Sequence, residues 1–216
     1  MLCLARDDQT ARFQKAWLDT AVERGAELMP SMFWRPQNGW RCYTGVDLGI
    51  SQKPGADLTS FATIAVAPNG DRRLLCVESG RWTADIIVQK IVQHHQRYGC
   101  QSITVESVAA QDFIVQLVRK ATSVPVRGFK TGVGVMSLAY GAEQLAVEFS
   151  NSKWIVPRIT VGGKMDSEIE QLLSELLYYT PAAHCGDRLA ALLMCVDGCK
   201  AGSMRIESGR INLMGR

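Results

Sequence analysis

The sequence lacks any apolar run that approaches the ~20 residues required of a membrane-spanning helix, so no membrane association is predicted. Its first residues, MLCLARDDQ, are too short and too acidic for a signal peptide. These two absences favour a cytoplasmic protein. The chain also lacks a strong charge imbalance, because 24 Lys and Arg against 21 Asp and Glu leave a net charge of +3. Any nucleic-acid-binding surface must therefore be a local basic patch.

Two common site motifs are missing as well. None of the seven cysteines forms a CxxC pair and their number is odd, so we expect reduced, buried thiols. A zinc site built from His184, Cys185, Cys195 and Cys199 would match no standard ligand spacing. No GxxxxGK(S/T) phosphate loop is present, since GGKM at 162–165 lacks the first glycine and the final hydroxyl. The chain by itself is therefore not expected to translocate DNA with ATP.

What the sequence does contain is an α/β pattern preceded by a segment of different character. Residues 1–40 hold one amphipathic helix, predicted over Ala11–Leu28 or ending earlier at Gly25, and then a linker with two prolines and a glycine. The last residues carry several Lys and Arg and are expected to be exposed. The predicted organisation is an N-terminal helix and linker at 1–40, a folded domain at 41–199 and a basic C-terminal tail at 200–216.

Within the central domain, the order of the elements predicts the fold class. Three apolar strands with short connections come first, and an Asn-Gly turn favours an antiparallel meander. Helices and strands then alternate, which requires parallel pairing. Strands are expected at 41–51, 59–68, 71–79, 102–107, 124–129 and 153–157, and helices at 83–99, 109–121, 137–152, 164–180 and 184–198. This order is that of a ribonuclease H-like mixed central β-sheet flanked by helices, although other α/β folds share the general plan.

Three carboxylates stand where this order could bring them together. Asp47 ends the first strand among apolar neighbours, and Glu106 ends the fourth strand, at the carboxyl edge where sites collect in α/β sheets. Asp187 begins the last helix. Each also has an ordinary explanation, as a turn residue, a loop residue or a partner of the helix dipole. Carboxylates that converge repel one another and bind hard divalent cations readily.

Other acids are expected to have lesser roles. Asp57, near the start of the second strand, is either a turn residue or a supporting acid close to the cations. The acids of the 164–180 helix are expected to form a solvated face, and they are Asp166, Glu168, Glu170 and Glu175.

Four segments together resemble the nuclease domain of the large terminase subunit of tailed bacteriophages, a ribonuclease H-like enzyme. They are YTGVDLGIS with ADLTSFATIAV, ITVESVAAQDFIVQLV, VPVRGFKTG and HCGDRLAALLM, and the resemblance runs from about Arg41 to about Gly198. It implies that Asp47, Glu106 and Asp187 are the catalytic residues and bind two Mg²⁺ or Mn²⁺ ions. It further implies a metal-dependent endodeoxyribonuclease that cuts concatemeric viral DNA during genome packaging.

The same resemblance implies partners and a location. The partners would be double-stranded DNA, the terminase ATPase domain, the small terminase subunit and the portal. Residues 1–40 would then be the join to an ATPase domain, in a truncated or split gene. A phage or prophage protein of this kind would act in the cytoplasm of the bacterial host.

The sequence departs from the pattern of this family at two places beside Asp187. Many relatives have an acid immediately before that aspartate, where this chain has Gly186, and another three residues after it, where this chain has Ala190. The three main acids are retained. The departures bear on the strength of the second cation site.

DNA cleavage without strong sequence preference depends on phosphate contacts from basic side chains. Arg188 is of special interest because it adjoins Asp187, and its guanidinium would be well placed to face the scissile phosphate. The candidate DNA-binding residues are Arg188, Lys130, Arg127, Lys164 and Arg81.

Several alternatives share parts of this pattern. A Holliday-junction resolvase or an integrase-like ribonuclease H-fold enzyme would use the same cations on another substrate. A non-catalytic packaging or docking module would follow from an incomplete acid cluster. An actin-like ATPase also begins with a GxDxG strand, but no second phosphate loop is recognisable. Neither His94 nor His95 is placed to act as an essential base.

Overall fold

The computed structural model describes residues 11–26, 39–49, 57–107, 112–130, 138–158, 164–181 and 185–211, the last helix from 201 onward and residue 121 by backbone alone. Its strands are β1 (Arg41–Asp47), β2 (Thr59–Val66), β3 (Arg72–Gly80), β4 (Ser102–Glu106), β5 (Val126–Phe129) and β6 (Trp154–Ile155). Its helices are α1 (Lys15–Arg24), α2 (Ala84–Tyr98), α3 (Asp112–Ala121), α4 (Leu138–Ser150), α5 (Ser167–Leu177) and α6 (Asp187–Ile211).

The strands form one mixed sheet in the order β5-β4-β1-β2-β3-β6. β1, β2 and β3 pair antiparallel as a meander, with Tyr43 opposite Ile64 and Ala62 opposite Val77. β4 then pairs parallel with β1, and β5 pairs parallel with β4. The helical crossovers between these strands make the parallel pairing possible. The predicted ribonuclease H-like sheet, antiparallel first and parallel afterwards, is confirmed.

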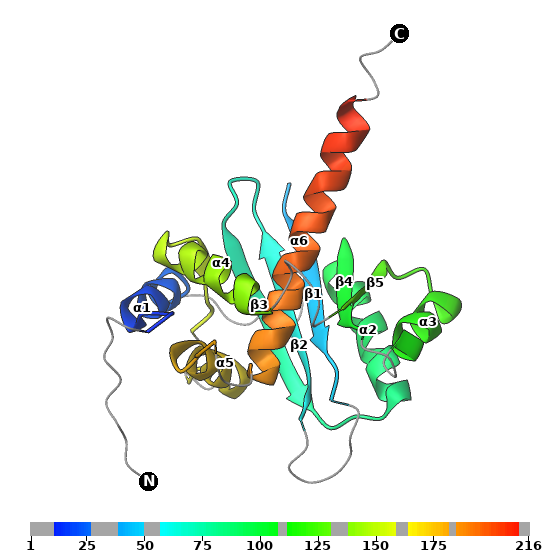
Figure 1. Ribbon diagram of the computed structural model, residues 1–216, viewed down its shortest axis with the longest axis horizontal. Coiled ribbons are helices and arrows are strands. Elements are labelled where there is room, and N and C mark those ends of the chain that lie inside the picture. Colours follow the sequence, from blue (N-terminus) through cyan, green and yellow to red (C-terminus); the bar gives the residue numbers. More distant parts are fainter. Residues whose placement is uncertain are drawn as a thin grey trace.

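Helices cover both faces of the sheet because its strands are apolar on both sides. One core lies between the sheet and α1, α4, α5 and α6. The other lies between the sheet and α2 with α3. In Figure 1, α6 crosses the middle of the sheet, and its C-terminal part extends beyond the body of the protein. None of the helices in the described ranges is both long and apolar enough to cross a membrane.

Gly45 lets α6 lie directly on β1. A Cβ atom added at Gly45 would stand 1.9 Å from the carbonyl oxygen of Ala191 and 2.4 Å from the amide nitrogen of Cys195. Any side chain there would push the helix away from the sheet. The close approach fixes where α6 runs, and therefore where its first residue, Asp187, meets the sheet.

The N-terminal helix belongs to the same folded body as the sheet. Phe13 is fully buried and packs edge-on against Phe149 and Tyr179, at centroid distances of 6.0 and 6.1 Å. The backbone of Val156 donates to the carbonyl of Ala21 at 2.9 Å. The predicted boundary at 40/41 therefore does not separate α1 from the central domain. Most of the predicted linker, 27–38, lies outside the described residues.

Two helix ends differ from the longer predictions. α1 ends before Gly25, as the second reading of that segment proposed. α6 continues to Ile211, well beyond the expected end near Gly198, so part of the predicted tail is helical. Gly198 does not end the helix because its lack of a side chain serves packing, since a Cβ there would stand 2.6 Å from the hydroxyl of Thr104.

The expected reduced cysteines are confirmed for every cysteine in the described ranges. Six free thiols are found, at Cys42, Cys76, Cys100, Cys185, Cys195 and Cys199. Cys195 donates to the carbonyl of Tyr43 at 3.2 Å, and Cys199 donates to that of Cys195 at 3.3 Å. Both thiols are thus held within the α6 packing, and His184, the other member of the considered zinc set, lies outside the described residues.

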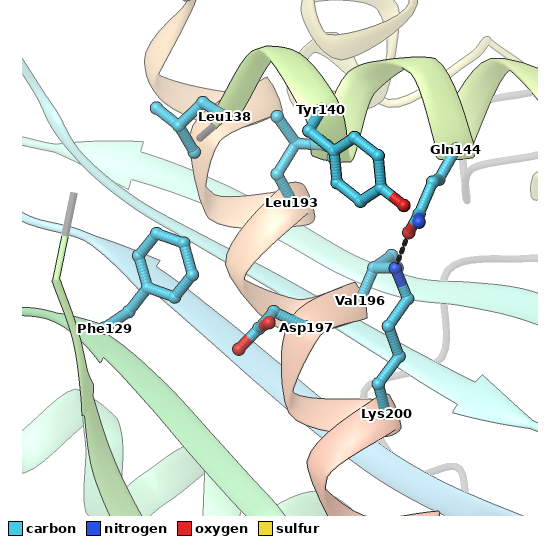
Figure 2. A pocket seen from close by; sticks show the side chains of 9 residues that line it. Phe129, Leu138, Tyr140, Gln144, Leu193, Val196, Asp197 and Lys200 are labelled. Atoms are coloured by element: carbon cyan, nitrogen blue, oxygen red, sulfur yellow. Dashed lines mark hydrogen bonds between the residues drawn. The ribbon is translucent and has the colours of Figure 1, made fainter. Parts of the chain in front are cut away.

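A cavity of about 110 Å³ lies where α4 meets α6. Figure 2 shows it bordered by Leu138 and Tyr140 from α4 and Leu193 from α6, with Lys200 bonded to Gln144 at one side. Asp197 also borders it, ten residues after Asp187, or roughly 15 Å along the helix. The cavity is therefore distant from the first turn of α6.

Gly141→Ala is expected to stabilise the protein by about 0.5–1 kcal/mol, since glycine in a helix interior costs that much relative to alanine. The added Cβ would meet Leu193 at 3.4 Å, an ordinary van der Waals contact in the wall of the cavity. Thermal unfolding should show a Tm rise of about 2–3 °C. Gly186→Ala is the matched control and should lower Tm, because its Cβ would stand 2.4 Å from the Glu175 carboxyl group. A lower Tm for Gly141→Ala would contradict this packing.

Candidate metal centre

The strand register brings two of the predicted acids to one edge of the sheet. β1 and β4 run parallel, with Val46 opposite Val105, so Asp47 and Glu106 follow at neighbouring strand ends. Each is the last residue of its strand and is half-buried. The apolar residues before them hold both strands in the core, which leaves the two carboxylates at the rim.

The start of α6 brings the third acid to the same edge. The Leu58 amide donates to Asp187 Oδ2 at 2.9 Å. Leu58 directly precedes β2, whose residue Ser60 lies opposite Asp47. This hydrogen bond fixes one carboxylate oxygen of Asp187 next to the strand that pairs with β1. Asp57, adjacent to Leu58, is exposed at the same edge.

The pKa of Asp47 shows how close these acids are. Burial raises it most, and the charge of Glu106, a hydrogen bond with Glu106 and the charges of Asp187 and Asp57 raise it further. Together they lift it from 3.8 to about 9. At neutral pH the cluster therefore holds a proton that a lone aspartate would have released.

The donor set suits a hard divalent cation. Carboxylate oxygens are the ligands that Mg²⁺ and Mn²⁺ prefer, and a bound cation would relieve the repulsion that raises the Asp47 pKa. Over the described part of the chain, no three His, Cys, Asp or Glu side chains already stand in a geometry that holds a metal ion. Asp47 and Glu106 are instead joined by a hydrogen bond, and the proton occupies the place in the charge balance that a cation would take.

Cys185 is part of this surrounding, and the sequence gave no indication of it. Burial raises the pKa of its thiol to about 12, and the charges of Asp47, Glu175 and Asp187 contribute. The thiol therefore stays neutral at physiological pH and is no thiolate ligand.

Arg188 does not lie where the DNA-contact prediction placed it. Its side chain is 8% exposed, and its guanidinium lies between two acids of α5. Nε donates to Glu168 at 2.9 Å, and Nη1 donates to Glu175 at 3.1 Å. In this arrangement the guanidinium neutralises two carboxylates and does not face the position of a phosphate beside Asp187.

The expected solvated acidic face of α5 is wrong for three of its four members. Asp166 caps the helix by accepting from the amides of Glu168 and Ile169. Glu168 also accepts from the Ser79 hydroxyl, and Glu175 accepts from the Leu189 amide. Only Glu170 is exposed. Glu168 and Glu175 are seven residues apart, which places them on one helical stripe beside the buried face, and this phase was the available signal.

Three of the remaining basic candidates are exposed near the same edge. Lys130 follows Phe129, which lies opposite Glu106, and Arg81 follows Gly80, which lies opposite Thr59 at the start of β2. Lys164 precedes α5, whose first turn contacts Ser79 near the end of β3. Arg127 differs, because it is ion-paired with Asp197 and donates to Thr104 at 3.1 Å.

His94 is buried in a separate polar network on the α2 side of the sheet. One ring nitrogen contacts the Thr63 hydroxyl at 2.8 Å and the other contacts Glu78 at 2.6 Å. Burial alone would raise the pKa of Glu78, but the hydrogen bonds and charges of His94 and Lys90 lower it to about 2. His94 is therefore a structural residue, as the sequence indicated when it gave this histidine no catalytic role.

Solved structures with the same arrangement of elements identify the fold. The large terminase nuclease from thermophilic phage G20c superposes with a TM-score of 0.53 at 17% identity, over 84% of this chain and 96% of that one. The chain has the ribonuclease H-like fold of that nuclease. No family model matches the sequence. No curated protein matches it either.

Two larger terminases contain the same ribonuclease H-like fold. The HK97 bacteriophage large terminase gives a TM-score of 0.55 at 15% identity, over 87% of this chain and 43% of that one. The large terminase of another thermophilic bacteriophage gives 0.57 at 14%, over 91% and 45%. The chain thus spans less than half the length of these two proteins. At such identities the likeness is one of fold, and activity has to be inferred from the site.

Proposed function

We propose that the chain is a metal-dependent DNA endonuclease that acts as the nuclease of a large terminase and cleaves concatemeric viral DNA during packaging. The observation that carries this proposal is the convergence of Asp47, Glu106 and Asp187 at one edge of a ribonuclease H-like sheet. Buried acids that repel one another at a sheet edge have no evident structural benefit. A site for divalent cations gives them one.

In this proposal Asp47 bridges two Mg²⁺ or Mn²⁺ ions, Glu106 holds one and Asp187 holds the other. Two such ions, when bound, supply an activated water and stabilise the leaving oxygen of a phosphodiester. The Leu58 amide keeps the Asp187 carboxylate turned toward the strand ends. Glu106, hydrogen-bonded to Asp47, keeps the two strand-end carboxylates side by side. Asp57 is a supporting acid, and no protein nucleophile is required.

The proposed partners follow from the fold of the neighbours. Double-stranded DNA is the substrate. A terminase ATPase domain, the small terminase subunit and the portal are the proteins with which the nuclease would assemble, in the cytoplasm of a bacterial host. Support comes from HK97, whose large terminase is more than twice as long as the part this chain matches.

Plasmid cleavage tests the activity. Supercoiled plasmid is incubated with the protein in Mn²⁺, in Mg²⁺ and in EDTA. Relaxed and linear products that appear with either cation and not with EDTA support the nuclease. A folded protein that leaves the plasmid intact in both cations contradicts it and favours a non-catalytic docking module. A strong preference for four-way junctions over linear duplex would instead point to a resolvase.

The exposed basic residues Arg81, Lys130 and Lys164 are expected to contact phosphates. Alanine at each position should weaken DNA binding alike for all sequences and lower the salt slope of log K by about one. DNA affinity is measured at several salt concentrations in Ca²⁺, so that no cleavage interferes. Lys120→Ala is the matched control, because it is exposed at the end of α3, beside the start of β5 and thus at the opposite sheet edge. An equal loss with Lys120→Ala would contradict a DNA surface around the acids.

A further inference from the structure

Helix α6 begins at a residue that cannot cap it. The carbonyl of Gly186 accepts from the Ala190 amide at 2.8 Å, which makes Gly186 the N-cap residue. At this position Ser, Thr, Asp or Asn normally accept the free amides of the first turn, and glycine has no side chain to do so. Asp187 is the next residue, so the proposed metal ligand stands on an end of the helix that lacks its own cap.

Glu175 of α5 supplies the missing cap from outside the helix. Its Oε2 accepts from the Leu189 amide at 2.8 Å, the bond that an N-cap side chain would make. A Cβ added at Gly186 would stand 2.4 Å from both Cδ and Oε2 of Glu175. The backbone at Gly186 is not in the left-handed region, so no conformational need for glycine exists there. Glycine is required because the Glu175 carboxylate occupies the space of a side chain.

The cap is anchored to the rest of the fold. Oε1 of Glu175 accepts from Arg188, whose guanidinium also reaches Glu168. Glu168 in turn accepts from Ser79 of β3. The side chains of Glu175 and Arg188 are 19% and 8% exposed, so water competes little for these bonds. The first turn of α6 is therefore tied to both α5 and the sheet.

We propose that Glu175 is a positioning residue for the metal centre, capping α6 across the helix interface and thereby holding Asp187 at the strand ends. This inference rests on the proposed function. It assigns Glu175 no contact with a cation or with DNA. Its role is to keep the first turn helical, so that the Asp187 carboxylate stays against the Leu58 amide and beside Asp47.

A cycle of four proteins tests the cap by thermal unfolding without any cation. Glu175→Ala should lower Tm by roughly 5 °C, since it removes the cap and one partner of Arg188. Gly186→Ser should also lower Tm, because its Cβ collides with Glu175. The double variant should be more stable than either single one, since serine then caps the helix in cis. A double variant no more stable than Glu175→Ala would overturn the proposal.

Mn²⁺ binding, followed by electron paramagnetic resonance, separates positioning from simple structural support. Glu175→Ala should weaken Mn²⁺ binding about 10–100-fold, as loss of a residue that orients a ligand does, and lower kcat while KM for DNA stays unchanged. Glu175→Gln, which keeps an oxygen for the Leu189 amide, and the double variant should recover much of this loss. Glu170→Ala removes an exposed α5 acid and should change nothing.

Either of two results would overturn the positioning role. One is a lower Tm for Glu175→Ala with wild-type Mn²⁺ affinity and kcat. The other is a similar loss with Glu170→Ala. Absence of Mn²⁺ binding by the wild type would overturn the proposed nuclease instead, and the unfolding cycle without cation would still decide whether Glu175 caps α6.

Discussion

Asp47→Asn should make the protein more stable at pH 8 and abolish its DNA cleavage. The folded-state pKa of Asp47 is about 9, against an ordinary value of 3.8. A carboxyl group with a raised pKa favours the folded state while it is protonated, and this contribution is lost as pH rises from about 4 through about 9. Asparagine is neutral at every pH and still donates a hydrogen bond to Glu106, so it keeps the contribution.

The expected gain at pH 8 is roughly 2 kcal/mol, or about 5 °C in Tm, and it should vanish near pH 4. Cleavage should fall by about 10³-fold or more, because an amide is a poor ligand for a cation that contributes several kcal/mol to the reaction. Thermal unfolding between pH 4 and pH 9, with a plasmid assay in Mn²⁺, measures both effects. Added Mn²⁺ should raise Tm for the wild type and not for the variant.

Asp85→Asn is the matched control, because Asp85 is exposed in the first turn of α2. It should change neither the pH dependence nor the cleavage. If Asp47→Asn destabilises the protein at pH 8, the acids do not repel one another as described. If it cleaves normally, Asp47 is no ligand.

Arg188→Ala should lower the free energy of unfolding by about 3–5 kcal/mol, one of the largest effects expected of any single substitution here. Glu168 and Glu175 would be left without their shared cation in a partly buried site, and an unpaired buried charge costs that much. Chemical denaturation measures the loss. Arg188→Lys should fall between the two, because an ammonium group cannot reach both carboxylates as the planar guanidinium does.

The same substitutions decide between the two roles considered for Arg188. A residue that contacts the scissile phosphate would lower DNA affinity and the salt slope with little change in stability. A residue that holds α5 and α6 together would lower stability and leave the salt slope of the folded protein unchanged. Unchanged stability with weaker DNA binding would restore the phosphate contact and contradict the ion-pair geometry.

The strands, the crossovers and the three acids could be predicted because their signals are local. Alternating or continuous apolar residues define strands, and the 3.6-residue period defines helices such as α2, which ends at Gly99 as expected. A meander followed by crossovers leaves few possible sheets, so the ends of β1 and β4 had to be neighbours. Asp47 and Glu106 were found for that reason.

The tertiary structure alone decided what the other charged residues do. Nothing local tells that Glu175 fills the space beside Gly186, that Arg188 turns toward α5 rather than toward a phosphate, or that α1 shares the core of the sheet. These contacts join residues that are 11 or more positions apart, and they depend on how helices of the same amphipathic pattern are turned against one another. The sequence by itself determined the sheet and the acids at its edge, because hydrophobic period and strand order are written along the chain. The partners of each charge were decided by packing, because a buried charge takes whichever opposite charge or free amide the neighbouring element brings within reach.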